Sequence, residues 1–410
     1  MSSLPTSPGD SPNRSPSTHP IPPLGIRIAT EPSKLTETIE RIRRWLCDYE
    51  LQNFIEISPL QIEGSDNAAC LVSGAAVQVR LNDQAFSKWT PDFDTLGLAS
   101  SIREFYGQNV SNALEKETLL AMLACPIGFD YPSLEECESS FRIRVNIAHA
   151  ASKTFLSFDA YGAERPDDYW HYDEEKGFLI KPGMPLIEAL RLATQPGESG
   201  TVYSFSCYRA TEYVVALGIA QEAQRVNPAL MRRLQTQAER RAIRSGEFHE
   251  VFMKEYGSRE KPLPPKYYVA GDRVWFKNPD PDSANALGFE GSWLFYIGNG
   301  LFSDFWKRNK AFTLELKCLE IYHWRDSTYQ DDQGVYWMDE QRVQQHMRQT
   351  EHSPEKIAEI MSKMQRIQDG RGIYADGGCI DPSREYTRWV RPENCDIQLS
   401  DATDAVDELR

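Results

Sequence analysis

One cysteine in this sequence lies where its thiol could act as a nucleophile. Residues 204–211 (Ser-Phe-Ser-Cys-Tyr-Arg-Ala-Thr) predict a change from extended chain to helix, with Ser206 as the capping residue. Cys207 would then lie in the first helical turn, where unpaired N–H groups and the helix dipole lower the pKa of a thiol. A thiolate attacks acyl carbons, and nearby amides can stabilise the resulting oxyanion. The residues alone leave a buried structural cysteine as the alternative.

The common cofactor and metal motifs are missing from the sequence. It has no H-E-x-x-H, no Walker A loop, no glycine fingerprint after a predicted strand and no G-x-S-x-G elbow. The seven histidines are scattered, and no two have the spacing of metal ligands. We interpret Gly-Asn-Gly at 298–300 as a hairpin turn and not as a phosphate loop. The motifs therefore predict neither a metal nor a cofactor.

A helix and an antiparallel sheet are the elements expected to position Cys207. The helix should run from Cys207 to about residue 220, after an extended stretch at 203–205. Apolar and aromatic runs predict strands over 268–276 and 292–297, and the second strand leads into the turn at 298–300. We therefore expect the Cys207 helix to pack on a sheet that contains both strands.

Further segments carry helix or strand signals. Apolar residues at helical spacing over 35–49 predict an amphipathic helix capped by Ser33. Ser-Leu-Glu-Glu at 133–136 has the form of a capping box. Alternating apolar residues over 312–318 predict a half-buried strand. Ser-Pro-Glu at 353–355 predicts the start of another helix.

The composition indicates a globular protein with an acidic surface. Of 410 residues, 40% are hydrophobic and 26% are charged, and the formal net charge is −15. This acidity argues against nucleic acid as a partner. No apolar run is long enough for a membrane helix, and the N-terminus lacks the pattern of a secretory signal. The eight cysteines form no CxxC pair. We therefore expect reduced thiols, no membrane partner and a cytoplasmic location.

Composition and motif density divide the chain into five stretches. Residues 1–23, with seven prolines and six serines, should form a disordered tail. An N-terminal extension is expected over 24–111, and the cysteine domain over 112–310. A C-terminal extension follows over 311–395, and an acidic mobile tail over 396–410.

Several blocks between about 115 and 306 resemble one known family. They occur in that family's order and at similar spacing, and the sequence is similar to the bacterial spore-coat protein-glutamine gamma-glutamyltransferases. The blocks are C-P-I-G-F-D-Y at 125–131, F-R-I-R-V-N-I-A at 141–148, D-Y-W at 168–170, K-P-G-M-P at 181–185, Y-S-F-S-C at 203–207 and G-D-R-V-W-F-K-N-P-D at 271–280.

The resemblance implies a fold and a reaction. The fold would be α+β, with a papain-like or NlpC/P60-like core, and the enzyme would need no metal or other cofactor. Cys207 would attack the carboxamide of a protein glutamine, release ammonia and pass the acyl group to a lysine or other amine. The partners would be proteins that contain glutamine and lysine, and the product an isopeptide cross-link. Two alternatives remain open: a cysteine amidohydrolase or deamidase with water as acceptor, and a non-catalytic binding protein of the same fold.

The sequence departs from the resembling family beside the nucleophile. The family has glutamate immediately before the cysteine and at the start of a later strand, where this chain has Ser206 and Ser292. Glu290 is the candidate replacement, because residues i and i+2 of a strand share a face. Asp304 falls near the family's histidine and is the second candidate for a base or orienting group. Ser206, Ser292 and Trp293 are the expected binding positions.

Overall fold

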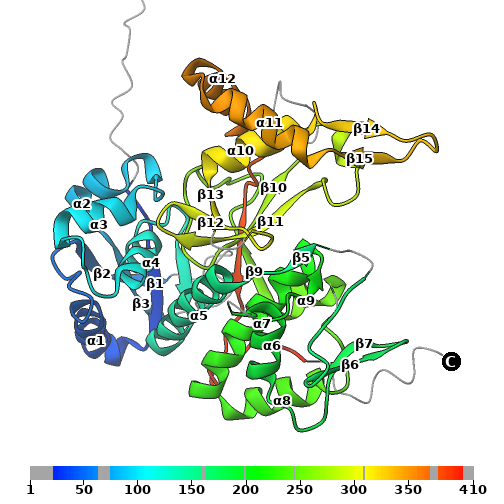
Figure 1. Ribbon diagram of the computed structural model, residues 1–410. Coiled ribbons are helices and arrows are strands. Elements are labelled where there is room, and N and C mark those ends of the chain that lie inside the picture. The colour runs from blue at the N-terminus through cyan, green and yellow to red at the C-terminus, as the bar shows by residue number, and fades with distance from the viewer. Residues whose placement is uncertain are drawn as a thin grey trace, which may run out of the picture.

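The computed structural model describes residues 22–62, 74–158, 162–197, 200–243, 245–307, 310–369 and 377–399. It has the expected mixed α+β composition, with two main sheets and helices packed against them (Figure 1). No helix within these ranges is both long and apolar enough to span a bilayer. Of the two predicted tails, residues 1–21 and 400–410 lie outside the described residues.

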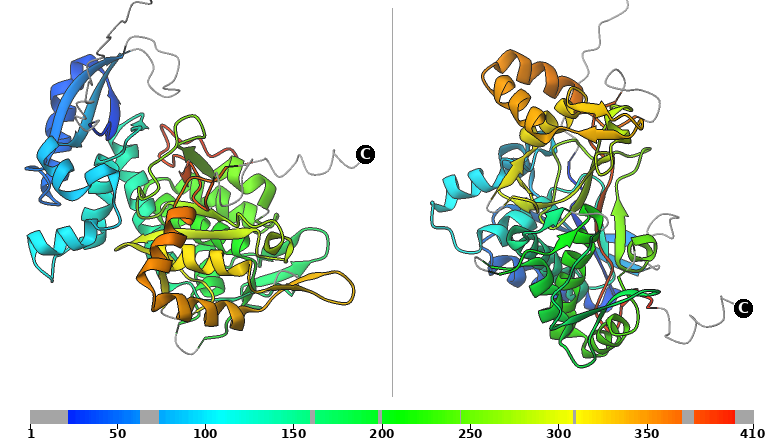
Figure 2. Two further views of the ribbon diagram at one scale, coloured as in Figure 1. Left: turned by 90° about the horizontal axis from the view of Figure 1, so that it is seen from above. Right: turned by 45° about the vertical axis from the view of Figure 1, so that its right-hand side comes forward.

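The first sheet has four strands in the order β2-β3-β1-β4. These are β1 (Ile26–Thr30), β2 (Ile55–Ile62), β3 (Gly74–Leu81) and β4 (Phe129–Tyr131). Beside it lie α1 (Leu35–Cys47), α2 (Asp83–Trp89), α3 (Leu98–Tyr106) and α4 (Ala113–Leu123). This sheet and these helices, coloured blue to cyan, lie at the left of the left-hand view in Figure 2. Because β1 pairs in parallel with β4, backbone pairing crosses the boundary predicted at 111/112.

The second sheet has six strands in the order β13-β12-β11-β10-β16-β9. They are β9 (Met253–Tyr256), β10 (Arg273–Lys277), β11 (Gly291–Gly298), β12 (Leu301–Ser303), β13 (Ala311–Thr313) and β16 (Arg384–Thr387). The prediction that one antiparallel sheet contains both β10 and β11 is confirmed, as is the β11–β12 hairpin, and the structure adds that β10 and β11 pair directly. Gly298, Asn299 and Gly300 all have positive φ, which explains this composition of the turn. Pairing of β13 with β12 and of β16 with β10 crosses the boundary predicted at 310/311.

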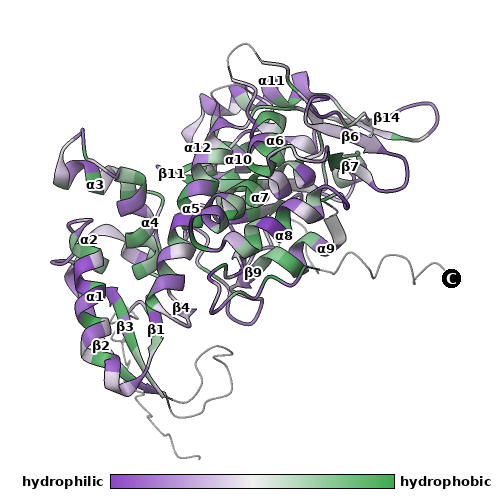
Figure 3. Cartoon of the chain, turned by 90° about the horizontal axis from the view of Figure 1, so that it is seen from below, coloured by the Kyte–Doolittle hydropathy of each residue, from purple (hydrophilic) through white to green (hydrophobic). Residues whose placement is uncertain are grey.

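A layer of helices packs against this sheet. The two longest are α5 (Leu134–Lys153) and α7 (Cys207–Val226), which contact each other and β11. The neighbouring helices are α6 (Leu186–Thr194), α8 (Pro228–Ala238) and α9 (Ser245–Phe252). Figure 3 shows hydrophobic residues concentrated in α4 and α7, whereas α1 is mostly polar. This contrast matches their positions, because most residues of α4 are buried and α1 buries only Ile42 and Leu46.

The remaining elements of the described residues are short strand pairs, a group of helices from the C-terminal part of the chain and single 3₁₀ turns. The short pairs are β5 (Ser157–Phe158) with β8 (Ser204–Phe205), β6 (Trp170–Asp173) with β7 (Gly177–Ile180), and β14 (Thr328–Gln330) with β15 (Tyr336–Met338). Three helices pack together above the second sheet in Figure 1: α10 (Leu314–Trp324), α11 (Glu340–Glu351) and α12 (Pro354–Met364). Single 3₁₀ turns occur at Pro32–Lys34, Pro91–Phe93 and Ser283–Asn285.

Two predicted helix starts agree with the structure. The Ser133 side chain accepts a hydrogen bond from the N–H of Glu136 at the start of α5, and Ser353 accepts one from the N–H of Lys356 at the start of α12. The capping box is only half formed, because the Glu136 carboxylate instead accepts the N–H groups of Val390 and Arg391. Glu136 therefore joins α5 to the C-terminal segment.

Four local expectations were wrong. Ser33 does not cap α1, because it lies inside the 3₁₀ turn Pro32–Lys34. The predicted strand over 312–318 is mostly helix, because the Thr313 side chain accepts the N–H of Leu316 and starts α10. The strand expected over 268–276 begins only at Arg273, after a turn.

The fourth correction concerns the acidic tail expected to begin at residue 396. Ile397 and Leu399 are buried with the core around α7 and α8. The Asp396 carboxylate accepts the N–H of Trp389 and pairs with Lys254 at 2.7 Å. Packed chain therefore continues to at least Leu399.

Candidate active site

Cys207 is the first residue of α7, as the sequence predicted. The extended pair β8 (Ser204–Phe205) precedes it, and Ser206 has extended backbone angles of φ −80° and ψ 157°. The Ser206 Oγ accepts the N–H of Arg209 at 3.4 Å, which satisfies one of the unpaired donors of the first turn. The serine cap therefore ends the strand and places the thiol at the helix N-terminus.

Backbone amides from two elements lie near the Cys207 sulfur. The N–H groups of Trp293, in β11, and of Tyr208 and Cys207 itself, in α7, each act to lower the pKa of the thiol. The rings of Tyr208 and Trp293 pack edge to face with centroids 5.5 Å apart. The first turn of α7 is thus attached to β11, which confirms the expected packing of the cysteine helix on the antiparallel sheet.

Burial determines the ionisation of this thiol. Desolvation raises the pKa of Cys207 above its usual value, and the amides of Trp293 and Tyr208 only partly oppose that effect. The negative charge of Glu290 raises the pKa further. The expectation that the helix N-terminus gives Cys207 a lowered pKa is therefore wrong, because the cost of burying a thiolate exceeds the stabilisation from the nearby dipoles.

Glu290 lies immediately before β11 and is exposed. Its carboxylate is close enough to act on the thiol through its charge. Ser292, two residues later, pairs with Phe276 of β10 and is half-buried. Of the two candidate carboxylates, Glu290 is thus the one that interacts with Cys207.

The loop that carries Glu290 is held by Asn278, a residue for which the sequence predicted no separate role. Asn278 is 3% exposed, and its backbone N–H donates to the Glu290 carbonyl at 3.0 Å. Its side-chain amide donates to the Phe289 carbonyl at 2.8 Å and to Ser283 Oγ at 2.9 Å. The F-K-N-P-D run at 276–280 was the signal that could have identified it.

Asp304 lies in a different environment. It is 7% exposed after β12, and its Oδ1 accepts the N–H of Trp306 at 3.0 Å. Burial raises its pKa, and the charged groups that modify this shift are Lys317, Lys307 and Glu320. None of these three residues is among the groups that shift the pKa of Cys207, where the charged neighbour is Glu290. Asp304 and Cys207 therefore have different charged neighbours.

A buried ionic network behind the cysteine was not predicted. The Arg273 guanidinium, 1% exposed, lies 5.0 Å from the Tyr208 ring centre and 4.5 Å from that of Trp293. It donates to Glu385 at 2.5 Å, and Glu385 accepts from His249 at 3.1 Å. The hydrogen bond to Glu385 raises the pKa of His249. These residues come from β10, β16 and α9, so no local pattern could have revealed the network.

Comparison with known proteins identifies the family. The family model of protein-glutamine gamma-glutamyltransferases (TGL) matches residues 99–367, which is more than half of the chain. The chain belongs to this family. A similar protein is the protein-glutamine gamma-glutamyltransferase of Bacillus subtilis (strain 168), with 27% identity over 186 residues. That match covers 43% of this chain and 65% of the relative, slightly less than two thirds of its length.

A solved structure also aligns with this member of the gamma-glutamyltransferase family. It is the transglutaminase from Geobacillus stearothermophilus without its C-terminal extension, with 16% identity and a TM-score of 0.36. The alignment covers 52% of this chain and 98% of that structure.

The sequence blocks at 141–148 and 271–280 contact each other in the core of this gamma-glutamyltransferase family member. Arg144 Nη1 and Asp272 Oδ1 are 2.6 Å apart, with side chains 1% and 0% exposed. The other Asp272 oxygen accepts the Tyr256 hydroxyl at 2.5 Å and the N–H of Val269 at 2.8 Å. Gly271 has φ +87°, and a Cβ there would lie 2.5 Å from the Arg144 carbonyl oxygen. The pair thus connects α5 to the start of β10, the strand beside β11.

A cavity of about 400 Å³ adjoins the residue before the nucleophile. Ser206 and Arg209 lie in its wall, together with Arg165 and Phe205. Arg165 is 5% exposed, and its guanidinium carbon lies 3.4 Å from the centre of the Phe205 ring. Burial lowers the pKa of Arg165. The cavity therefore combines an aromatic wall with a cation beside the N-terminus of α7.

Proposed function

We propose that this protein transfers the γ-glutamyl group of a protein glutamine to a lysine or other primary amine through a thioester on Cys207. The observation that carries the proposal is the position of Cys207 at the N-terminus of α7 against β11, where the Trp293 and Tyr208 amides act to lower the pKa of its thiol. Donors in that position can stabilise a thiolate and the oxyanion formed beside it. Membership of the gamma-glutamyltransferase family supports the same reaction.

The raised pKa of Cys207 means that the thiol must lose its proton as it attacks. In the proposed step a sulfur–carbon bond forms, and the thiol proton passes through Glu290 to the amide nitrogen, which leaves as ammonia. Glu290 is the candidate base because its carboxylate interacts electrostatically with the thiol. A neutral amine then attacks the thioester, its nitrogen bonds to the acyl carbon, and the thiol regains a proton.

The cavity beside Ser206 is the proposed entrance for the glutamine donor. Its volume of about 400 Å³ exceeds that of a single side chain and leaves room for neighbouring backbone. In this proposal Ser206, Ser292 and Trp293 line the approach to the thiol. Asp304 keeps only a positioning role, because its hydrogen bond is to Trp306 and its charged neighbours lie on α10 and in the loop after β12.

A second candidate function is binding without catalysis. Two observations favour it: Ser206 and Ser292 replace the glutamates of the resembling family, and burial raises the pKa of the thiol. Under this alternative the protein would bind glutamine-containing segments in the same cavity and form no covalent adduct.

The experiment supplies a glutamine peptide and a labelled amine and follows both amine incorporation and ammonia release. Wild-type protein should do both, and Cys207→Ala should do neither, whereas Cys47→Ala, at the exposed end of α1, should match wild type. Glu290→Gln should slow acylation by about 10²–10⁴-fold. Asp282→Asn, an exposed acid in the same loop, is its matched control.

The outcomes separate the candidate functions. Ammonia release without amine incorporation would indicate a deamidase. Peptide binding without an adduct would favour the non-catalytic protein. If the protein is active and both Cys207→Ala and Glu290→Gln retain full activity, the assignment of the site is wrong.

A further inference from the structure

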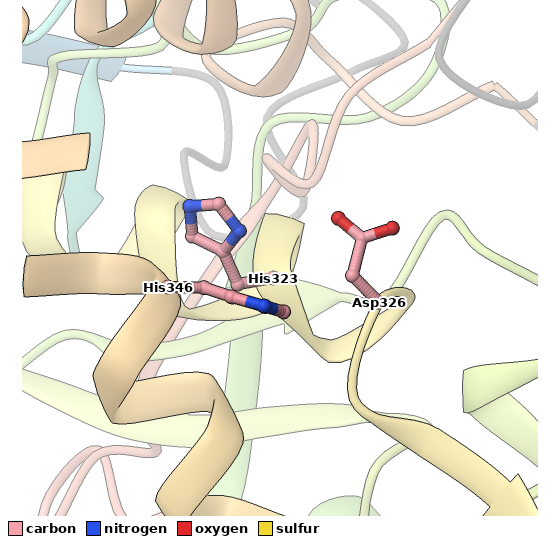
Figure 4. A group of neighbouring side chains, drawn as sticks. All are labelled: His323, Asp326 and His346. Atoms are coloured by element: carbon pink, nitrogen blue, oxygen red, sulfur yellow. The ribbon is translucent and has the colours of Figure 1, made fainter. Parts of the chain in front are cut away.

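Two histidines and an aspartate converge at the C-terminal helices. His323 lies in the last turn of α10, Asp326 in the turn that follows, and His346 on α11. Each offers one potential ligand atom, and these atoms all lie within 4.8 Å of one another (Figure 4). Among the residues that the structure describes, this is the only such group of three histidine, cysteine or acidic side chains.

Both imidazoles have a buried nitrogen without a hydrogen-bond partner. The Nδ1 atoms of His323 and His346 are removed from solvent and accept or donate no hydrogen bond. His323 is 7% exposed, and Figure 4 shows one of its ring nitrogens directed toward Asp326. A buried polar atom without a partner destabilises the folded state. A metal ion bound between these two nitrogens and the carboxylate would satisfy both of them.

The other nitrogen of His323 supports this interpretation. Its Nε2 lies 2.9 Å from Thr350 Oγ1, on the next turn of α11 after His346. When Nε2–H donates to that hydroxyl, the lone pair of the neutral ring is on Nδ1, which faces the group. Histidines that bind metals almost always donate their second N–H to such a partner.

The carboxylate of Asp326 is available to a metal ion. It contacts Arg325 at 3.4 Å, and this exposed pair is weak enough to be exchanged for a metal bond.

We propose that His323, His346 and Asp326 bind a divalent transition-metal ion, with Zn²⁺ as the representative. Two imidazole nitrogens and one carboxylate oxygen suit Zn²⁺ or Co²⁺, and a water would complete four-coordination on the exposed side of Asp326. Ligand atoms around tetrahedral Zn²⁺ stand about 3.3 Å apart, so side chains up to 4.8 Å apart need to move by only about 1–2 Å.

The ion would connect α11 to the end of α10 and the turn before β14. It would thereby stabilise the three-helix unit of α10, α11 and α12. None of the three ligands belongs to the Cys207 site, so the inference is independent of the proposed function.

The test uses the full-length protein, freed of metal with a chelator and kept reduced. Titration with Zn²⁺ against a chromophoric chelator should show one tight equivalent, and Zn²⁺ should raise the melting temperature. Asp326→Asn and His346→Gln should each weaken binding by at least tenfold. His352→Gln, an exposed histidine just after α11, is the matched control and should bind as wild type does.

Two further measurements test which side chains hold the metal ion. Thr350→Val keeps the shape of the side chain and should weaken Zn²⁺ binding by about 10–100-fold while the fold stays intact by circular dichroism. Co²⁺ should give d–d bands without thiolate charge transfer. A charge-transfer band would overturn the proposal, because it would place the metal at cysteines such as the buried pair Cys318 and Cys379, whose sulfurs are 3.6 Å apart. Absence of stoichiometric binding, or equal binding by Asp326→Asn, His346→Gln and wild type, would overturn it as well.

Discussion

Asn278 and Glu290 are joined by a backbone hydrogen bond of 3.0 Å, donated by the N–H of Asn278. This bond closes the loop between β10 and β11 and determines where the Glu290 backbone enters β11. The Asn278 side chain holds the same loop through Phe289 and Ser283. The position of the candidate base therefore depends on a buried amide.

Asn278→Ala should lower both stability and acylation. The substitution leaves the Phe289 carbonyl and the Ser283 hydroxyl without that donor, which should cost about 1–3 kcal/mol in the free energy of unfolding. Urea denaturation and the amine-incorporation assay measure the two effects. Asn285→Ala, which removes an exposed bond to Pro281, is the control and should change neither by much. Unchanged stability in Asn278→Ala would contradict the role of this amide.

Ser206→Ala should destabilise the protein by about 0.5–2 kcal/mol, because it removes the cap of α7. It should also slow acylation, since a frayed first turn moves the Cys207 thiol away from the Trp293 amide. Ser353→Ala removes the equivalent cap of α12 and should cost similar stability without affecting acylation. Equal acylation rates in the two variants would show that the α7 cap has no catalytic importance.

The alkylation rate of Cys207 should have its pH midpoint above the ordinary value for a thiol. Burial and the charge of Glu290 both raise its pKa, so the thiolate fraction at neutral pH is small. Peptide-resolved mass spectrometry after iodoacetamide pulses at increasing pH measures the profile. In urea the midpoint should fall, because unfolding removes the desolvation. A native midpoint below the unfolded one would mean that the amides outweigh burial.

Asp304→Asn should gain stability relative to wild type as the pH rises. The folded-state pKa of Asp304 is raised by burial, so its protonated form favours folding and its ionised form opposes it. The wild-type protein therefore loses stability as pH increases from about 4 through the raised pKa, and the asparagine variant does not. Denaturation of both proteins between pH 4 and pH 7 tests this, and a pH-independent difference would refute it.

Local signals in the sequence determined much of the framework around the site. The serine caps of α7 and α12 and the Gly-Asn-Gly turn act through hydrogen bonds or φ angles within a few residues, so their sequences predict them. The segment at 312–318 was wrongly predicted as a strand, because a helix buried on most sides also has apolar residues at alternate positions. The Thr313 hydroxyl caps this segment and starts the helix α10.

The sequence alone determined that Cys207 begins a helix after a strand, and its family-like blocks placed Glu290 near that cysteine. Only the tertiary structure decided the ionisation of the thiol, because its burial and the nearby amide of Trp293 both depend on chain that is distant in sequence. The same holds for His323 and His346, which lack ligand spacing in sequence and meet only when α10 packs against α11. Caps and turns depend on neighbours along the chain, whereas burial and ligand geometry depend on neighbours in space.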